Sequence, residues 1–230
     1  MKVFDLEQPR AIDLAVDAVH TRPIIVQLPS VFVLLAAPTS AGARQLDHVK
    51  TRLPGKNYGT AIGSLTRFVE QAQRQEMPPE FSAVDQFVPL TGTFVRLPFR
   101  SVECNTATIR AGTHQGVLLD GLQRQLFRRI EESFLDQPAD PIWQGRNYCA
   151  PLCTSCNESG HPERAIFEAQ KAFAFAETFG VDFVLRSRAA DGKLGSYPIF
   201  GFEREGVRVH REGPRLDQFK ERIPQRLRSW

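Results

Sequence analysis

The stretch Leu-Cys-Thr-Ser-Cys-Asn-Glu-Ser-Gly occupies residues 152–160, between an apolar run at residues 148–152 and the sequence His-Pro-Glu-Arg. The apolar run predicts a strand end, and the proline that follows the stretch predicts a helix start. Free backbone N–H groups and the positive end of a helix dipole would then face the turn, as at many anion sites. Ser155, Ser159 and Asn157 would add polar groups. A capped loop without a ligand is the alternative interpretation of this stretch taken alone.

The bulk composition predicts a globular protein of one large domain or two small ones. The chain has 230 residues, 42% of them hydrophobic, and a formal net charge of +3. That charge is too small to indicate nucleic-acid binding by itself. The longest apolar run, residues 31–37, is far shorter than the roughly 20 residues that a membrane span needs. The early acidic residue Asp5 also differs from a signal peptide. We therefore expect a cytoplasmic protein that binds no membrane.

The four cysteines would be reduced in the cytoplasm. Three of them, with one histidine, form the pattern Cys-x3-Cys-x2-Cys-x4-His at Cys149, Cys153, Cys156 and His161. Structural zinc sites usually draw ligands from two separated pairs, and no second pair is present. We therefore favour small apolar fillers around a loop, with zinc as a minor alternative.

Helical and strand periodicities alternate along the chain. Expected helices are residues 9–20, 44–52, 64–75, 115–132 and 163–178. Expected strands are residues 23–28, 30–37, 58–62, 92–97, 107–110, 181–185, 197–202 and 207–210, with a strand end at 148–152. Expected turns or loops are residues 38–42, 77–79 and 136–145, and the basic stretch 215–230 is either a helix or a mobile arm. This order predicts a single α/β (α+β) domain with a mixed, twisted sheet.

Four places offer groups that suit a nucleoside triphosphate. Lys50 and Arg52 stand two residues apart, so they share a site only if their helix ends there. Arg110 and Arg211 each belong to or follow an expected strand, and Ser155 belongs to the central stretch. Arginine provides a fork for phosphate or carboxylate, and lysine a point charge. Taken singly, each basic residue is more typical of a solvated or structural position.

The order of these pieces resembles the YrdC-like family, the threonylcarbamoyl-adenylate synthases. No Gly-x4-Gly-Lys-Ser/Thr phosphate loop and no Gly-x-Gly-x-x-Gly turn is present. The counterparts of the family's motifs are Pro38-Thr39, Lys50-Thr51-Arg52, Pro89-Leu90-Thr91-Gly92-Thr93, Arg110-Ala111-Gly112-Thr113-His114, Ser155-Cys156-Asn157-Glu158-Ser159-Gly160, Ser196 and Arg211-Glu212-Gly213. The match covers nearly the whole chain, up to Gly213. Each motif is weak alone, but their order and spacing are fairly specific.

The resemblance implies a YrdC-like domain over residues 1–214, with a twisted sheet around a basic cavity, and a basic tail at residues 215–230. It implies condensation of ATP, bicarbonate and L-threonine into threonylcarbamoyl-adenylate and pyrophosphate, with Mg²⁺, for threonylcarbamoyladenosine modification of tRNA. No side-chain nucleophile and no metal ligand from the protein is implied, because a carbamate oxygen attacks the α-phosphorus. By resemblance, the residues that contact the nucleotide are Lys50, Thr93, Ser155, Asn157 and Arg211. Those that contact the amino acid or carbamate are Thr39, Arg52, Arg110 and Ser196.

The sequence departs from the family pattern mainly around the amino acid. The family's turn Pro-Thr-Asp-Thr-Val-Tyr-Gly-Leu is here Pro-Thr-Ser-Ala-Gly-Ala-Arg-Gln at residues 38–45, without its acidic and aromatic residues. Pro198 stands in the counterpart of Ser-Thr-Val and removes a backbone donor. We therefore expect an ATP-dependent enzyme of the YrdC-like type, with threonine or another amine as the acceptor. The alternative is a module that binds a nucleotide or double-stranded RNA without catalysis, which the basic residues of 203–230 support.

Overall fold

The computed structural model describes residues 1–51, 56–157, 165–188 and 195–230. Its strands are β1 (Lys2–Asp5), β2 (Ile24–Gln27), β3 (Phe32–Ala36), β4 (Gly59–Ala61), β5 (Thr93–Pro98), β6 (Thr113–Leu118), β7 (Leu152–Ser155), β8 (Phe183–Arg186), β9 (Ile199–Glu203) and β10 (Gly206–Arg211). Its α-helices are α1 (Ala11–Val19), α2 (Ser40–Lys50), α3 (Leu65–Glu70), α4 (Gly121–Glu132), α5 (Ala169–Phe179) and α6 (Leu216–Glu221). Short 3₁₀ helices lie at Arg74–Glu76, Pro79–Phe81, Val84–Leu90, Pro141–Trp143 and Gln225–Leu227.

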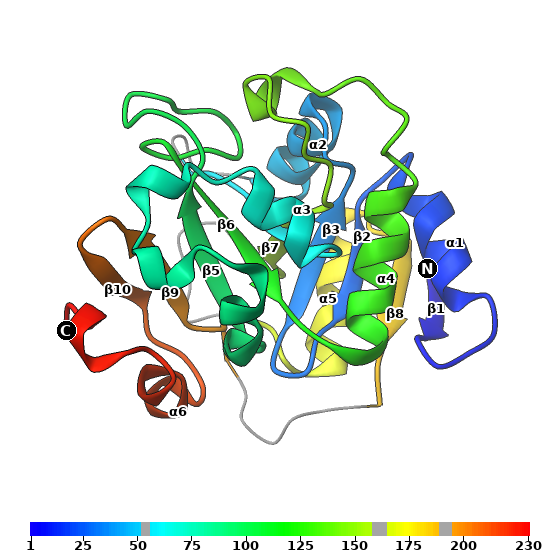
Figure 1. Cartoon of the computed structure of the whole chain (residues 1–230). Coiled ribbons are helices and arrows are strands. Elements are labelled where there is room, and N and C mark those ends of the chain that lie inside the picture. Colours follow the sequence, from blue (N-terminus) through cyan, green and yellow to red (C-terminus); the bar gives the residue numbers. More distant parts are fainter. Residues whose placement is uncertain (52–55, 158–164, 189–194) are drawn as a thin grey trace.

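Within these residues, ten strands form one mixed sheet in the order β1-β8-β2-β3-β7-β4-β6-β5-β9-β10 (Figure 1). The neighbours β2 and β3 pair antiparallel, as expected for two successive apolar runs. In the other half of the sheet, β6 pairs parallel with β4 and antiparallel with β5. The expected α/β class, with a mixed sheet flanked by helices, is confirmed. Of the described helices, none combines the length and apolar character needed to cross a membrane.

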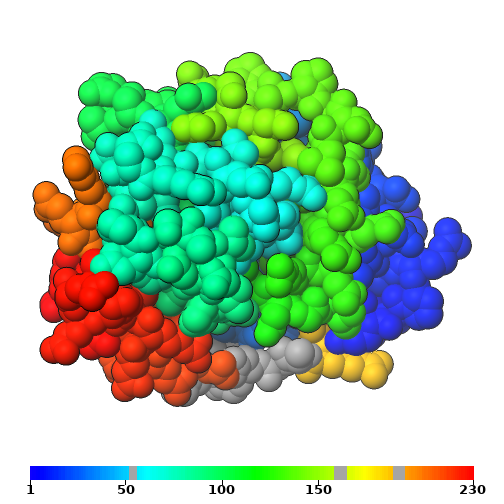
Figure 2. All heavy atoms as spheres, in the orientation of Figure 1, coloured from blue at the N-terminus to red at the C-terminus, as the bar shows by residue number. Residues whose placement is uncertain are grey.

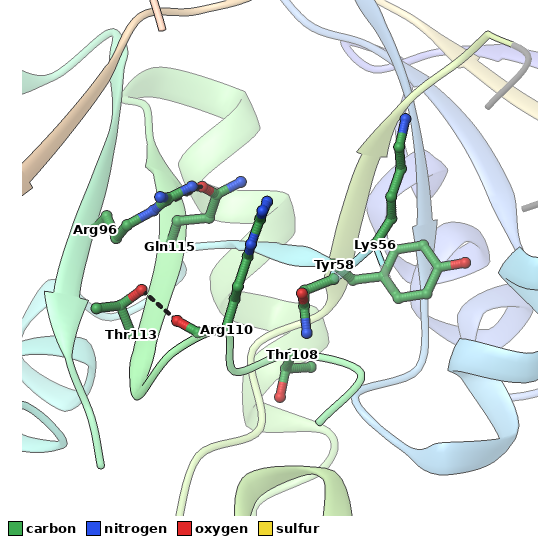
Figure 3. A pocket seen from close by; sticks show the side chains of 8 residues that line it. Lys56, Tyr58, Arg96, Thr108, Arg110, Thr113 and Gln115 are labelled. Atoms are coloured by element: carbon green, nitrogen blue, oxygen red, sulfur yellow. Dashed lines mark hydrogen bonds between the residues drawn. The ribbon is translucent and has the colours of Figure 1, made fainter. Parts of the chain in front are cut away.

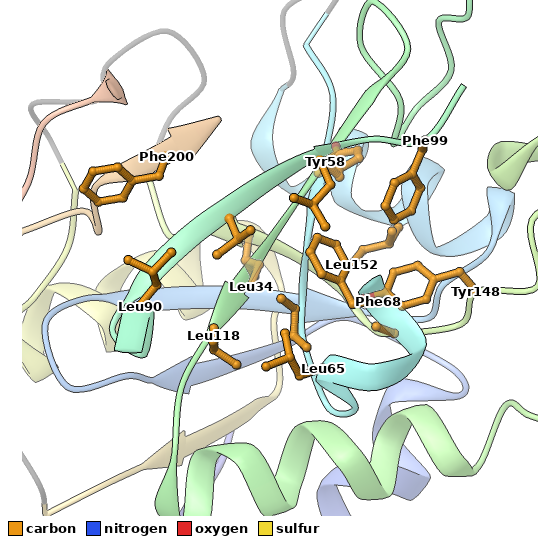
Figure 4. Close-up of a cluster of buried hydrophobic side chains, with 14 of the residues drawn as sticks. Leu34, Tyr58, Leu65, Phe68, Leu90, Phe99, Leu118, Tyr148, Leu152 and Phe200 are labelled. Atoms are coloured by element: carbon orange, nitrogen blue, oxygen red, sulfur yellow. The ribbon is translucent and has the colours of Figure 1, made fainter. Parts of the chain in front are cut away.

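Helices cover both faces of the sheet, because successive strand residues point to opposite faces and both faces carry apolar side chains. A first core cluster joins α2, α3, α5 and α6 to one face, which we call the first face. It includes large buried rings such as Phe68, Phe99 and Tyr148 (Figure 4). A second cluster joins α1 and α4 to the opposite face, the second face. On β5, Val95 belongs to the first cluster and Phe94 to the second.

The helix expected at residues 115–132 is wrong in its first part. Thr113–Leu118 form strand β6, between β4 and β5, and α4 begins only at Gly121. The apolar residues of this segment have helical spacing, but the segment forms a strand because its backbone pairs with two neighbouring strands. The strand expected at residues 107–110 is also wrong, because these residues form a loop and Arg110 makes only an isolated bridge to the first residue of β6.

Three expected boundaries differ as well. The turn expected at residues 38–42 is already the start of α2, where the Thr39 side chain accepts a hydrogen bond from Gly42 N at 3.1 Å. A side chain at Gly42 would clash, because its Cβ would lie 2.1 Å from the carbonyl oxygen of Ala37. Helix α3 ends at Glu70, earlier than expected. Strand β7 includes Ser155, so the central stretch is itself partly a strand.

The helix expected at residues 163–178 begins at Ala169, with Glu168 as its N-cap. Residues 165–168 are not helical, and residues 158–164, including Ser159 and His161, lie outside the described residues. The N-terminus of α5 therefore does not directly follow the turn at Asn157. The residues that directly follow this turn lie outside the described ranges, so the expected anion site there stays a prediction.

The C-terminal residues pack against the rest of the chain, and the red residues of Figure 2 lie against its body. Phe219 of α6, with Ile223 and Leu227, belongs to the first core cluster. Arg226 pairs with Glu80 at 2.7 Å. Of the two possibilities left open by the sequence, a helix or a mobile arm, the structure shows the helix.

Candidate functional site

Strand register aligns a row of residues across the second face of the sheet. The row runs from β7 through β4, β6 and β5 to β9, and its members are Cys153, Gly59, Gln115, Arg96 and Gly201. Because two members are glycines, the long polar side chains of the row are those of Gln115 and Arg96. These two side chains therefore define the polar part of this face.

Arg96 is held in place by the residue opposite it on β6. Gln115 Oε1 accepts hydrogen bonds from Arg96 Nε at 3.2 Å and from Arg96 Nη2 at 2.6 Å. Both side chains are half-buried. Because glutamine is neutral, it orients the guanidinium without compensating its charge. Burial lowers the pKa of Arg96, and the nearby charge of Arg110 lowers it further.

Arg110 stands at a tight hairpin that leads into β6. Ala111 and Gly112 both have positive φ angles, 45° and 72°. Arg110 and Thr113 exchange backbone hydrogen bonds of 2.8 and 2.9 Å. This is the geometry of a type I′ turn, which fixes the direction of the chain on either side. Within the described residues, the exposed Arg110 guanidinium has no hydrogen-bond or ion-pair partner.

Hydrogen bonds from two side chains hold the loop before this hairpin in place. Asn57 Nδ2 donates to the carbonyl oxygen of Ile109 at 2.8 Å. His114, which is 1% exposed, donates from Nδ1 to the carbonyl oxygen of Thr108 at 2.8 Å, because a carbonyl can only accept. Its Nε2 then accepts from Thr60 Oγ1 at 2.9 Å. Burial lowers the pKa of His114 to about 4, so the ring is neutral at physiological pH.

A pocket of about 180 Å³ opens between these elements. Figure 3 shows the side chains of Arg96 and Gln115 in contact, with Arg110 beside them. The lining residues are Lys56, Asn57, Tyr58, Arg96, Thr108, Arg110, Thr113 and Gln115. Three of the eight are basic and none is acidic. The pocket therefore has the composition of an anion site.

Arg211 reaches the same face from β10. The register between β10 and β9 shifts just before Arg211, and such bulges re-aim side chains. Its Nε and Nη2 donate to the carbonyl oxygen of Tyr197 at 3.0 and 2.7 Å, and its Cζ lies 5.4 Å from the centre of the Phe94 ring. Burial lowers the pKa of Arg211 to about 10, Cys153 opposes this change and Arg96 adds to it. The guanidinium remains protonated at neutral pH.

Lys50, the last residue of α2, is 3% exposed and lies at the end of β7. Its Nζ donates to the carbonyl oxygens of Ser155 and Asn157 at 2.5 and 2.7 Å, and to Asn157 Oδ1 at 3.0 Å. Ser155 Oγ also donates to Asn157 Oδ1, at 2.6 Å. The structure thus brings together three of the residues expected to contact a nucleotide. In this arrangement Lys50 holds the turn after β7.

The charges of Lys50 and Arg211 both act on one thiol, that of Cys153. Burial raises the pKa of Cys153 to about 12, and both cations oppose that rise. We call the surface formed by Lys50, Arg96, Arg110 and Arg211 the cationic face. Within the described part of the chain, its three arginines form no ion pair with a carboxylate. Gathered positive charges without acidic partners are typical of a site that binds a polyanion.

The two threonines predicted to contact ligands lie elsewhere. Thr39 caps the N-terminus of α2, whose 11 residues separate it from Lys50 by about 16 Å. Thr93 is fully buried on the first face, and its Oγ1 donates to the carbonyl oxygen of Leu90 at 2.8 Å. The structure does not bring these hydroxyls to the cationic face. Their predicted roles stay predictions.

Ser196, by contrast, lies near Arg211. A Cβ on Gly213 would be only 2.4 Å from the carbonyl oxygen of Ser196, so the segments before β9 and after β10 pack tightly together. Arg211 also binds the next residue along, Tyr197. Arg52 lies outside the described residues, and its predicted role stays a prediction.

The cysteines lie in different surroundings, and among the described residues no group of three His, Cys, Asp or Glu side chains could hold a metal ion. Cys149 Sγ donates to the carbonyl oxygen of Glu131 at 3.5 Å, whereas Cys153 and Cys156 are buried near Lys50. Burial raises the pKa of all three thiols. The geometry therefore offers no support for the zinc interpretation in this part of the chain.

Sequence reasoning missed Arg96 and Gln115. The available signal was a charged residue inside the apolar run at residues 94–97, where alternation places Arg96 on the same face as Phe94. Gln115 was hidden because its strand was assigned to a helix. Once β6 is recognised, the pairing of Gln115 with Arg96 follows from the register.

No protein-family model matches the chain, and no curated protein matches it in sequence. Solved structures with a similar fold include P. abyssi Sua5 complexed with L-threonine, with a TM-score of 0.70 and 14% identity over 99% of this chain and 62% of that chain. E. coli YciO has a TM-score of 0.58 and 14% identity over 95% of this chain and 98% of that chain.

Full-length HypF in its phosphate- and nucleotide-bound form has a TM-score of 0.60 and 14% identity, over 86% of this chain and 28% of that chain. The chain spans less than two thirds of the length of Sua5. These likenesses confirm the YrdC-like fold expected from the motifs, and at 14% identity they show the fold alone.

Proposed function

We propose that this chain, which has the fold of Sua5 and YciO, binds ATP at the cationic face and forms a carbamoyl-adenylate from ATP, bicarbonate and an amino acid. L-threonine is the default acceptor, since one Sua5 structure is complexed with it. The product would serve threonylcarbamoyladenosine modification of tRNA. The observation that carries the proposal is the gathering of Arg96, Arg110 and Arg211 on one sheet face without a carboxylate partner in the described residues.

The proposed reaction needs no side-chain nucleophile. The amine and bicarbonate combine to a carbamate and water. One carbamate oxygen then attacks the α-phosphorus of ATP, the bond to the bridging oxygen of the β-phosphate breaks, and pyrophosphate leaves. The protein has to hold the reactants in line and stabilise negative charge, which positively charged forks do well. Arg211 suits the phosphates because its guanidinium is oriented by Tyr197 and stacked over Phe94 before any ligand arrives.

The proposed Mg²⁺ would come with the triphosphate. The cationic face carries guanidinium and ammonium groups, whereas Mg²⁺ prefers carboxylate, carbonyl and water ligands. No group of three acidic, histidine or cysteine side chains suited to a metal is found in the described ranges. The residues present therefore do not form a magnesium site, and no step of the proposal depends on one.

A non-catalytic module that binds a nucleotide or double-stranded RNA is the alternative. It is favoured by the positions of Thr39 and Thr93, which the structure places away from the cationic face. HypF has a similar fold, and its structure contains a bound nucleotide, although that nucleotide binding is a property of HypF. RNA binding through phosphates would weaken steeply as salt is raised, and binding of a single nucleotide would weaken less.

The test is pyrophosphate release from ATP and bicarbonate, with and without L-threonine, alongside calorimetric titration of ATP. The variant Arg211→Ala should lose at least about tenfold in ATP affinity, because hydrogen bonds to charged groups are worth about 1.5–3 kcal/mol. The matched control is Arg129→Ala, an exposed arginine paired with Asp13 on α1, remote from the site. Its affinity and turnover should be unchanged.

Amino-acid-dependent pyrophosphate release that Arg211→Ala abolishes would support the enzyme. ATP binding without release for any amino acid would favour the binding module. Unchanged ATP affinity in a folded Arg211→Ala protein would refute the placement of the nucleotide on the cationic face.

A further inference from the structure

The pocket beside Arg96 is too small for a nucleotide. Its volume is about 180 Å³, and pockets for drug-sized ligands occupy roughly 300–1,000 Å³. A pocket of this volume suits a smaller molecule, of the size of an amino acid. The pocket therefore suits the acceptor or a part of it, while the phosphates would lie toward Arg211.

No acidic side chain of the lining compensates the positive charges of the pocket. Arg96 is paired with the neutral Gln115, and Arg110 has no partner among the described residues. The acidic residue of the adjoining strand β9, Glu203, is already paired with Arg208 at 3.2 Å. The lining contains these two guanidinium groups and Lys56 but no carboxylate, so a ligand has to compensate the charges of the two guanidinium groups.

L-threonine supplies one carboxylate for these two groups. In the proposed reaction its carbamate oxygen is directed at the α-phosphorus, and its side chain brings only a hydroxyl and a methyl group. The second guanidinium therefore receives no negative charge from L-threonine. An α-amino dicarboxylic acid supplies a second carboxylate at a distance of two or three carbons. Arg96 and Arg110 line the same small pocket, so the two carboxylates of one such ligand can meet both guanidinium groups (Figure 3).

We propose that the pocket formed by Arg96, Gln115 and Arg110 receives a side-chain carboxylate, so that the acceptor is an acidic amino acid such as L-aspartate or L-glutamate. This inference rests on the proposed function, because it names the acceptor class of that site. Arg96 acts as the specificity-determining residue: Gln115 orients it, and its charge selects an acidic side chain. The chemical step is unchanged, since the α-amine still forms the carbamate.

The experiment compares isosteric pairs of acceptors. Pyrophosphate release is measured with L-aspartate, L-asparagine, L-glutamate, L-glutamine and L-threonine, in the wild type and in Arg96→Gln. Binding of L-aspartate and L-asparagine is measured separately by calorimetry without ATP. The matched control is Arg129→Gln, an exposed arginine of α4 that pairs with Asp13 of α1. Melting temperatures verify that each variant is folded.

We expect the wild type to prefer L-aspartate or L-glutamate over its amide by about tenfold or more, and Arg96→Gln to lose that preference. Arg129→Gln should keep it. Equal activity and binding with acid and amide, or a preference for L-threonine, would overturn the inference while leaving the proposed function intact. If no acceptor releases pyrophosphate but L-aspartate binds in an Arg96-dependent way, the proposed reaction fails and the acidic pocket stands. Absence of L-aspartate binding, together with no Arg96-dependent release for L-glutamate, would overturn the pocket.

Discussion

Replacing Lys50 by methionine tests whether the end of α2 holds the turn after β7. The substitution keeps the length and most of the apolar stem of the side chain. It removes the ammonium group that donates to Ser155 O, Asn157 O and Asn157 Oδ1. Lys50 is 3% exposed and Asn157 is 6% exposed, so water has little access to the acceptors that lose their donor.

The expected loss of stability follows from these three acceptors. Each of the three lost hydrogen bonds has a charged donor and is worth about 1.5–3 kcal/mol. The substitution also removes the desolvation penalty of the buried ammonium group, which offsets part of this loss of stability. We expect the free energy of unfolding to fall by about 3 kcal/mol. For a domain of this size, that corresponds to a drop in melting temperature of about 6–12 °C.

The assay is thermal unfolding followed by circular dichroism, with urea unfolding at 25 °C as a second measurement. The matched control is Lys171→Met, a side chain that is 64% exposed and paired with Glu168 at 2.8 Å on the surface. The control should change the free energy of unfolding by less than about 0.5 kcal/mol. A Lys50→Met protein that melts within 2 °C of the wild type would refute the role assigned to Lys50.

Three further outcomes are expected. Burial raises the pKa of Glu131 to about 7, so the folded state binds more protons than the unfolded state between pH 4.5 and 7, and stability falls as the pH rises through that range. Urea unfolding of the wild type should show a free energy of unfolding lower at pH 7.5 than at pH 5 by on the order of 3 kcal/mol, and Glu131→Gln should abolish this difference. Equal pH dependence in both proteins would contradict it. Phe219→Ala should cost about 3 kcal/mol because the ring is 4% exposed, whereas Trp230→Ala, at 46% exposed, should cost less than 1; similar melting temperatures for the two variants would show that the tail is not part of the core. Iodoacetamide at pH 7.5 should modify Cys104 first, since burial raises the pKa of the other thiols. Mass spectrometry of the labelled folded protein measures this, and equal labelling of all four cysteines would contradict it.

Local periodicity was sufficient to predict a helix or strand where the element is strongly patterned and sharply bounded. Helix α1 and the pair β2 and β3 fall within the expected segments, and β5 ends one residue beyond its segment, because their apolar residues have one period and clear stop signals. The order of weak motifs was also sufficient for the YrdC-like fold. Likewise, the joint position of Lys50, Ser155 and Asn157 could be anticipated from that order.

Other features were undetermined by the sequence because they depend on partners far away along the chain. Residues 113–118 have the spacing of a helix, and only the neighbours β4 and β5 make them a strand. That strand brings Gln115 beside Arg96, 19 residues away, and so creates the polar pair of the pocket. Thr39 matched a motif, but its side chain is used to cap α2.

The sequence by itself determined the alternation of apolar and polar residues, and with it the α/β class and the identity of most core side chains. It also carried the basic residues and the order in which they occur. Only the tertiary structure decided which of those charges converge. Register between strands is a long-range property, and it places Arg96, Arg110 and Arg211 on one face while directing Thr93 to the other.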